Sequence, residues 1–239
     1  MHNNENGIKR PENSENRLYS PQVKICGLTH VDEAATCAAL GADAIGFIFY
    51  PQSPRVVTAG QAKAISKALP SFVSRVGVFV DETFDTIMPV VRTAGLTAVQ
   101  LHGRESPRLV EKISAQGLKV IKVLFSHREP FFTQAAHFPA AAYLVECGVG
   151  PLPGGNARAW DFSLLRDFGK DFPIVLAGGL SIHNVMEAII QSRPDAVDIS
   201  SGVEYFPGKK DIAKVRKFIK ATQKVRMKKQ NRRIFYVNN

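Results

Sequence analysis

The chain has 239 residues, of which 45% are hydrophobic and 22% are charged, a balance typical of a soluble globular protein. No apolar stretch approaches the ~20 residues that a transmembrane helix needs, and residues 1–20 lack the apolar segment of a secretory signal, so we expect no membrane association. The cysteines, Cys26, Cys37 and Cys147, are too few for a disulfide scaffold and favour a reducing, cytoplasmic setting.

The net charge of +10 comes from one end of the chain. From Lys214 onward there are ten lysines and arginines and no acidic residue, whereas the residues before Lys214 include 21 basic and 21 acidic ones. Cations near the end of a helix suit its dipole, and blocks of like charge are usually solvated. We therefore assign the basicity to a last helix and a solvated tail, and we do not expect nucleic acid to be a partner.

The chain order of the predicted elements indicates one domain. Residues 1–22 form a polar leader that we expect to be disordered, and residues 223–239 form the basic tail. Between them, short β-rich runs alternate with amphipathic helical patterns. The strands are predicted at 23–26, 44–49, 74–80, 98–101, 118–125, 142–146, 173–177 and 196–200, and helices at 31–41, 58–70 and 185–192, among others. This alternation predicts a single (β/α)8 TIM barrel over residues 23–222. A doubly wound open sheet is the competing architecture, but no GxGxxG motif follows the first strand.

Reactive side chains of such barrels lie at the C-terminal ends of the strands, which makes these positions the candidates for a site. The first strand ends in Cys26, and Lys24 points to the same side of that strand. A thiol here could be a nucleophile, a general base or a small buried apolar residue, since free cysteine packs well in cores. Cys37, on the apolar face of a predicted helix, is interpreted as inert.

Further polar side chains follow the second, fourth and sixth strands. Arg55, in a proline-containing loop, could pair with a carboxylate or a phosphate. The fourth strand places Gln100 and His102 on one face, and the sixth strand ends in Glu146. One such residue alone is often structural, but several at successive strand ends favour a shared site.

Glycines follow the last two predicted strands. Gly178 and Gly179 come after the seventh strand, and Ser201 and Gly202 come after the eighth. Glycine lets backbone N–H groups approach an anion closely, and paired loops at these two positions are the usual phosphate site of a barrel. The alternative is that these glycines only form tight turns. Asn184 could either cap or orient the helix that follows.

Several motifs together carry a family resemblance. VKICGLT, GADAIGFIF, SPR, VGVFV, VQLHG, LAGGL, NV and VDISSGVE followed by PGKKD occur in this order from Val23 to about Lys220. In this combination the chain resembles the phosphoribosylanthranilate isomerase family of tryptophan biosynthesis. KICG, QLHG and SSGVE are specific, whereas AGG alone fits many phosphate-binding barrels.

The resemblance implies an Amadori rearrangement of N-(5′-phosphoribosyl)anthranilate, with no metal and no cofactor, by a monomer or a homodimer. This chemistry needs an acid that protonates the ring oxygen and a base that removes the proton from C2. By position in the family's motifs, Cys26 would be the general base and Glu146 the general acid. Arg55 would face the anthranilate carboxylate, and His102 and Asp198 would line the substrate cleft. The phosphate would be held by Gly178, Gly179, Ser201 and Gly202.

Two positions depart from the family's pattern. The family has aspartate where this chain has Glu146, and glycine where Ala157 ends the GGNA segment at 154–157. The extra methylene moves the carboxyl group by on the order of 1.5 Å, and a ~1 Å misplacement can lower a rate about 10²-fold.

A weakly active or non-catalytic relative, retained for binding a phosphate ligand or nucleic acid through its tail, is therefore the alternative. The related histidine-pathway isomerase would need an aspartate where Cys26 stands. Asp161, after the loop, is interpreted as a helix N-cap.

Overall fold

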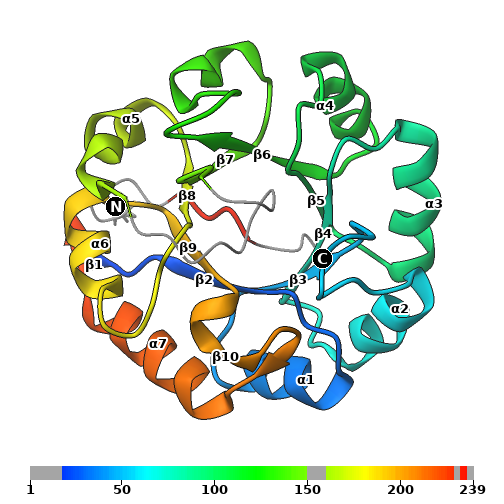
Figure 1. The fold of residues 1–239 in the computed structure, drawn as a ribbon, viewed down its shortest axis with the longest axis horizontal. Helices are drawn as coiled ribbons and strands as arrows, with labels where there is room; N and C mark the ends of the chain where they lie inside the picture. The colour runs from blue at the N-terminus through cyan, green and yellow to red at the C-terminus, as the bar shows by residue number, and fades with distance from the viewer. Residues whose placement is uncertain (1–17, 150–159, 229–231, 236–239) are drawn as a thin grey trace, which may run out of the picture.

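The computed structural model describes residues 18–149, 160–228 and 232–235. Its centre is a closed barrel of eight parallel strands in chain order, in which the last strand pairs with the first (Figure 1). The barrel strands are β2 Gln22–Cys26, β3 Ala44–Ile48, β4 Ser74–Phe79, β5 Ala98–Leu101, β6 Lys119–Phe125, β7 Ala142–Glu146, β8 Ile174–Leu176 and β9 Ala196–Ile199. Each predicted strand lies within one residue of these bounds. The TIM barrel is confirmed, and the open sheet is excluded.

Helices form a ring around the barrel (Figure 1). They are α1 Val31–Ala39, α2 Ala59–Ala68, α3 Phe84–Ala94, α4 Pro107–Ser114, α5 Leu165–Asp171, α6 Val185–Ser192 and α7 Ile212–Lys224, with the short 3-10 helices η2 Phe132–His137 and η3 Phe162–Leu164. Between β6 and β7, η2 takes the place of an α-helix, since Pro130 and Pro139 on either side restrict a longer helix. Within the described ranges, no helix is long and apolar enough to cross a membrane.

The alternation of side chains along the strands separates an outer core from the barrel interior. In β2, Ile25 packs in the outer core with residues of the helices, such as Cys37 and Phe218, whereas Lys24 and Cys26 face inward. Cys37 is fully buried there, as its interpretation as an inert core residue requires, and all three cysteines are free thiols. Because both faces of each strand are covered, the strands tolerate near-continuous apolar runs.

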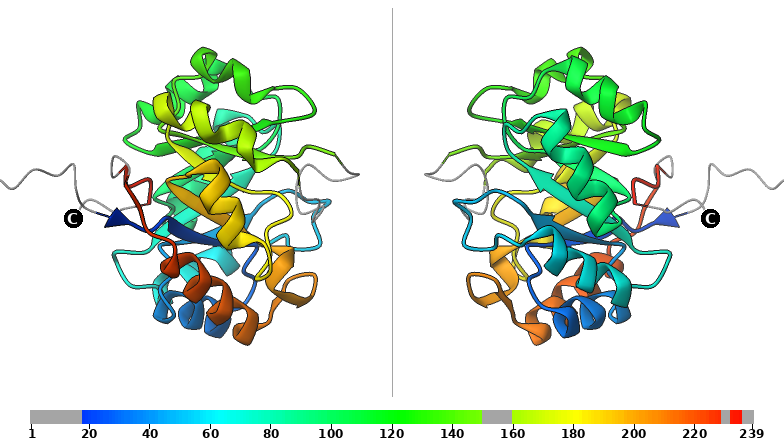
Figure 2. Two further views of the ribbon diagram at one scale, coloured as in Figure 1. Left: turned by 90° about the vertical axis from the view of Figure 1, so that its left-hand side faces the viewer. Right: turned by 90° about the vertical axis from the view of Figure 1, so that its right-hand side faces the viewer.

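The two ends of the described chain meet at the N-terminal face of the barrel. β1 Leu18–Tyr19 pairs antiparallel with β12 Met227–Lys228. Ile234 and Phe235 then join the apolar cluster of the barrel interior, with exposed fractions of 7% and 2%. Figure 2 shows these segments on the side of the barrel opposite the hairpin of β10 Glu204–Phe206 and β11 Lys209–Lys210.

The described part of the predicted tail therefore differs from the expected solvated segment. Gln22 donates from Nε2 to the carbonyl of Phe235 at 2.6 Å and accepts from the Phe235 N–H at 2.9 Å. Lys119 donates to the carbonyl of Ile234 at 2.9 Å. The physical reason is that Ile234 and Phe235, which follow the basic run, bury their apolar side chains in the N-terminal opening of the barrel. Residues 1–17 of the predicted leader lie outside the described residues.

Candidate active site

A cavity lies at the C-terminal ends of the barrel strands, at the end that parallel (β/α)8 barrels use for chemistry. The structure brings all nine predicted site residues to its lining: Cys26, Arg55, His102, Glu146, Gly178, Gly179, Asp198, Ser201 and Gly202. Apolar side chains such as Ile48, Val78 and Leu180 complete the wall. Polar groups that are far apart in the sequence therefore lie together in this cavity, and part of its wall is apolar.

Cys26 faces this cavity beside a buried ion pair. Lys24 Nζ lies 3.0 Å from Asp198 Oδ1, and the Lys24 side chain is fully buried. Burial raises the pKa of the Cys26 thiol, and the charge of Lys24 offsets only part of that rise. Burial also lowers the pKa of Lys24, but Asp198 and Cys26 together outweigh this, so the net shift of that pKa is upward. These two shifts favour a charged Lys24 and a protonated Cys26 thiol at neutral pH. Gly46 leaves room for the thiol, because a Cβ there would lie 2.6 Å from Cys26 Sγ.

Glu146, at the end of β7, is held by a chain of two hydrogen bonds from the end of β5, two strands away in the barrel. Gln100 Nε2 lies 3.0 Å from His102 Nδ1, and His102 Nε2 lies 3.0 Å from Glu146 Oε1. Because the amide nitrogen donates to Nδ1, the proton of a neutral imidazole sits on Nε2 and is donated to the carboxylate. His102 thus fixes the orientation of one carboxylate oxygen, Oε1, and does not contact the other, Oε2.

The loop that carries His102 is fixed by a second buried ion pair. Lys122 Nζ lies 2.8 Å from Glu105 Oε2 and 2.7 Å from the carbonyl of Gly103. Glu105 in turn accepts from the N–H of Gly103 at 2.9 Å and from the N–H of Asp81 at 3.1 Å. The loops after β4 and β5 are therefore tied together below the histidine.

The glycine turns after β8 and β9 meet at one wall of the cavity. Gly178 and Gly179 have φ values of +81° and +69°, in the region that favours glycine. A Cβ at Gly202 would lie 2.3 Å from the carbonyl oxygen of Leu180, so the two loops touch at a position that admits no side chain. None of the N–H groups of Gly178, Gly179, Ser201 and Gly202 donates a hydrogen bond within the described part of the chain. Four unused donors at one cavity wall are suited to an anion.

Asn184 stabilises the first of these turns rather than capping α6. Its Oδ1 accepts from the N–H of Ser181 at 2.8 Å, and its Nδ2 donates to the carbonyl of Gly179 at 2.9 Å. The side chain makes no cap hydrogen bond to α6. The cap that the sequence left open is therefore not observed, and the side chain holds the loop before the helix instead.

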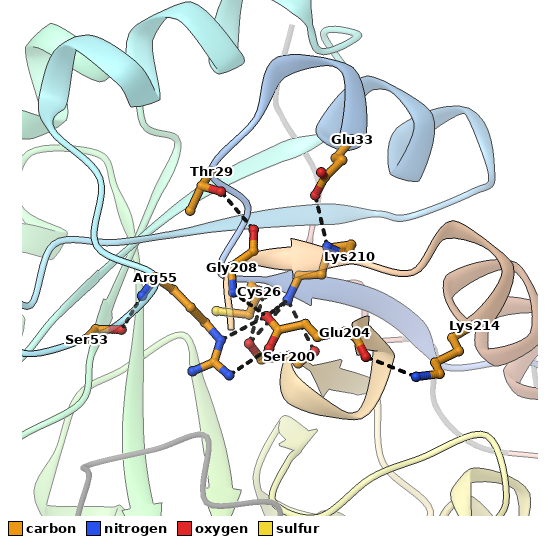
Figure 3. A network of polar contacts seen from close by, with 10 residues as sticks. All are labelled: Cys26, Thr29, Glu33, Ser53, Arg55, Ser200, Glu204, Gly208, Lys210 and Lys214. Atoms are coloured by element: carbon orange, nitrogen blue, oxygen red, sulfur yellow. Dashed lines mark hydrogen bonds and ion pairs between the residues drawn. The ribbon is translucent and has the colours of Figure 1, made fainter. Parts of the chain in front are cut away.

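Arg55 forms a bidentate ion pair that sequence analysis missed. Its Nε and Nη2 donate to the two carboxylate oxygens of Glu204 at 2.9 Å and 2.8 Å, and Lys210 Nζ lies 2.7 Å from Glu204 Oε1 (Figure 3). Glu204 and Lys210 stand in the quoted SSGVE and PGKKD motifs, without an assigned role. The available signal was their position directly after the last strand, at the same end of the barrel as Arg55.

Comparison with known proteins identifies the family. The model of the family described as N-(5'phosphoribosyl)anthranilate (PRA) isomerase matches residues 23–221. The chain belongs to this family. It is thus an isomerase, and the resemblance inferred from the motifs is confirmed.

Individual members of the isomerase family match almost over their full length. The N-(5'-phosphoribosyl)anthranilate isomerase of Desulfatibacillum aliphaticivorans is 46% identical over 214 residues, which cover 90% of this chain and 98% of that protein. The crystal structure of phosphoribosyl anthranilate isomerase from Thermotoga maritima has a TM-score of 0.78 at 41% identity and covers 86% of this chain and 100% of its own. A crystal structure of a phosphoribosyl anthranilate isomerase in complex with reduced 1-(o-carboxyphenylamino)-1-deoxyribulose 5-phosphate matches with a TM-score of 0.75 at 41% identity, and it covers 86% of this chain and 100% of its own.

The loop after β7, where this member of the isomerase family departs from the expected pattern, is described only at its two ends. Residues 154–157, including Ala157, lie outside the described residues. At the far end, Trp160 Nε1 donates to the carbonyl of Ala177 at 3.1 Å. Asp161 Oδ1 accepts from the N–H of Ser163 at 3.0 Å, which confirms its interpretation as an N-cap.

Proposed function

We propose that the chain converts N-(5′-phosphoribosyl)anthranilate into 1-(2-carboxyphenylamino)-1-deoxyribulose 5-phosphate in the cytoplasm, as a step of tryptophan biosynthesis. The observation that carries this proposal is the convergence of Cys26, Glu146 and the two glycine turns on one cavity. The related structure that contains the reduced product supports the choice of substrate.

Glu146 is the proposed general acid. Its protonated form donates to the ring oxygen of the furanose, the ring opens, and the bond between C1 and the anilino nitrogen becomes an iminium. The hydrogen bond from His102 Nε2 fixes one oxygen of the carboxyl group, so the other is the oxygen that faces the substrate. This contact supports a fixed position for the longer side chain that stands where the family has aspartate.

Cys26 is the proposed general base. Its thiolate takes the proton from C2 of the iminium, which gives an enol with an uncharged amine, and this enol becomes the ketone as C1 gains a proton and the C2 hydroxyl loses one. The raised pKa of Cys26 keeps most of the thiol protonated before the reaction, so the active fraction is the one that has already lost its proton to solvent. The positive iminium and the nearby Lys24 both favour the thiolate at the step that needs it.

The remaining residues are proposed to hold the two anionic ends of the substrate. The unused N–H groups of the glycine turns would bind the phosphate, and Arg55 would face the carboxylate. Asp198, paired with Lys24, would accept from a ribose hydroxyl. A monomer or a homodimer is expected, and nucleic acid is not proposed as a partner.

The test is steady-state turnover of freshly generated phosphoribosylanthranilate by the wild type, Cys26→Ala and Glu146→Asp. We expect turnover by the wild type, its loss in Cys26→Ala, and a change in Glu146→Asp that reports how well the longer acid is placed. A wild type as inactive as Cys26→Ala, but activated by Glu146→Asp, would instead support the alternative of a binding relative whose chemistry has been disabled.

A further inference from the structure

The carboxylate of Glu204 forms ion pairs with two buried cations, Arg55 and Lys210. Its Oε2 accepts from Arg55 Nη2 at 2.8 Å, and its Oε1 contacts Arg55 Nε at 2.9 Å and Lys210 Nζ at 2.7 Å (Figure 3). The exposed fractions of Arg55, Glu204 and Lys210 are 6%, 8% and 1%. One negative and two positive charges therefore leave an uncompensated positive charge at the edge of the cavity.

The Arg55 side chain is fixed along its whole length. The Arg55 N–H donates to Ser53 Oγ at 3.2 Å, and the stem passes over Gly27, where a Cβ would lie 2.6 Å from Arg55 Cδ. Glu204 occupies the edge of the guanidinium formed by Nε and Nη2. Nη1 has no hydrogen-bond partner among the described residues, and Figure 3 shows it directed away from Glu204. A planar guanidinium that is held by one edge presents the nitrogen outside that edge, here Nη1, in a fixed direction.

From this geometry we propose that Glu204 is a positioning residue that orients Arg55 so that Nη1 binds the aryl carboxylate of the substrate. Lys210 supplies the second cation, so two cations meet two carboxylates when the substrate is bound. Without Lys210, the pair of Arg55 and Glu204 would be neutral and would attract a further carboxylate weakly. The inference rests on the proposed function, since it assigns the site for one end of that substrate.

The protonation state of Glu204 is consistent with this role. Burial raises the pKa of Glu204, but Arg55 and Lys210 outweigh this effect, and the net shift of the pKa is downward. Glu204 is therefore ionised at neutral pH, as the pairing requires. Lys210 is anchored independently, because its Nζ also lies 3.2 Å from the carbonyl of Ser200.

The test measures binding rather than turnover. The two ligands are reduced 1-(o-carboxyphenylamino)-1-deoxyribulose 5-phosphate and its counterpart without the carboxyl group, each titrated calorimetrically into the wild type, Glu204→Gln and Glu33→Gln. Glu33 is the matched control, since it accepts from the N–H of Lys210 at 3.0 Å on the same hairpin and does not contact Arg55. We expect Glu204→Gln to lose the preference for the carboxylated ligand by about tenfold, as for one charge-assisted hydrogen bond, and Glu33→Gln to retain it.

Three outcomes would overturn the inference. The first is that Glu204→Gln keeps the full preference for the carboxylated ligand. The second is that Glu33→Gln loses this preference as much as Glu204→Gln does. In both cases, turnover of the substrate by the wild type would leave the proposed function intact. The third is a wild type that binds neither ligand, which overturns the proposed function as well. If Glu204→Gln does not fold, Glu204→Asp keeps the charge beside Lys210 but draws it back from Arg55, and the same loss of preference is expected.

Discussion

At the scale of single residues, the two reactive groups of the cavity are controlled by different neighbours. Cys26 lies beside a lysine that is itself paired with Asp198, whereas Glu146 accepts a hydrogen bond from His102. A cation beside the thiol favours the thiolate, but burial opposes it and prevails. The base is therefore formed only when pH or substrate provides a further driving force.

This balance gives a pH dependence with a definite sign. The pKa of Cys26 is raised above the usual thiol value of about 8.5, and the base acts when deprotonated. Below that pKa, the rate at which iodoacetamide alkylates Cys26 should therefore rise with pH by about tenfold per unit, because only the thiolate reacts. The measurement is a profile of the alkylation rate of Cys26 between pH 6.5 and 9.5, followed by mass spectrometry, with circular dichroism to check folding.

Cys37→Ala is the matched control for this profile. Cys37 is a buried thiol of α1 whose pKa burial raises to about 12, and it does not line the cavity. The variant should retain the wild-type profile. A wild-type profile that is flat from neutral pH upward would contradict the prediction, because it would mean that the base is already ionised.

At the scale of elements, the two turns after β8 and β9 act as one unit because they touch. Gly202 and the carbonyl of Leu180 meet where a Cβ would lie only 2.3 Å from the oxygen. A change in one turn must therefore displace the other, together with its unused N–H groups.

Gly202→Ala should consequently weaken binding of the phosphate end. We expect KM to rise about tenfold, the effect of one charge-assisted hydrogen bond, with a smaller change in kcat. Gly60→Ala in α2 is the control, since the nearest atom to its Cβ would be Thr58 Oγ1 at 3.9 Å. Inhibition by inorganic phosphate, compared among the wild type and both variants, checks the result. Equal inhibition of all three would contradict it.

The elements could be predicted from the sequence more fully than the contacts among their residues. Each strand was marked by a short apolar run, and the end of each run placed Cys26 and Glu146 at the barrel mouth. The pairing of His102 with Glu146 could not be predicted in this way, because the residues lie 44 positions apart and meet only through the barrel's register. Glu204 was missed for a similar reason: its partner Arg55 is 149 positions away.

At the scale of the whole molecule, the C-terminal segment closes the barrel at the end opposite the cavity. Phe235 is 2% exposed and joins the interior cluster, and both its backbone polar groups pair with Gln22. Ile234 and Phe235 form too short a run to show a helical or strand periodicity, so no sequence pattern separated them from the basic tail around them. Their role depends on an opening that exists only once the strands have closed.

Phe235→Ala should lower the free energy of unfolding and leave the KM for the substrate unchanged. A buried phenylalanine replaced by alanine loses about 3 kcal/mol, and Phe235 itself does not line the cavity. The control is Ile190→Ala on α6, a side chain that is 55% exposed and should change stability little. Denaturant unfolding and KM, measured on both variants, check the prediction. A large rise in KM for Phe235→Ala would contradict it.

The meeting of β1 and β12 at the N-terminal face has a practical consequence. Leu18 and Lys228 pair across one short antiparallel ladder, on the side away from the β10–β11 hairpin and the cavity (Figure 2). A second protein fused directly before Leu18, or a surface to which the chain is tethered there, would be attached behind the barrel, so substrate could still enter from the front. The same proximity makes it feasible to link Leu18 to Lys228 and open the chain elsewhere, for example in a loop between a helix and the strand that follows it.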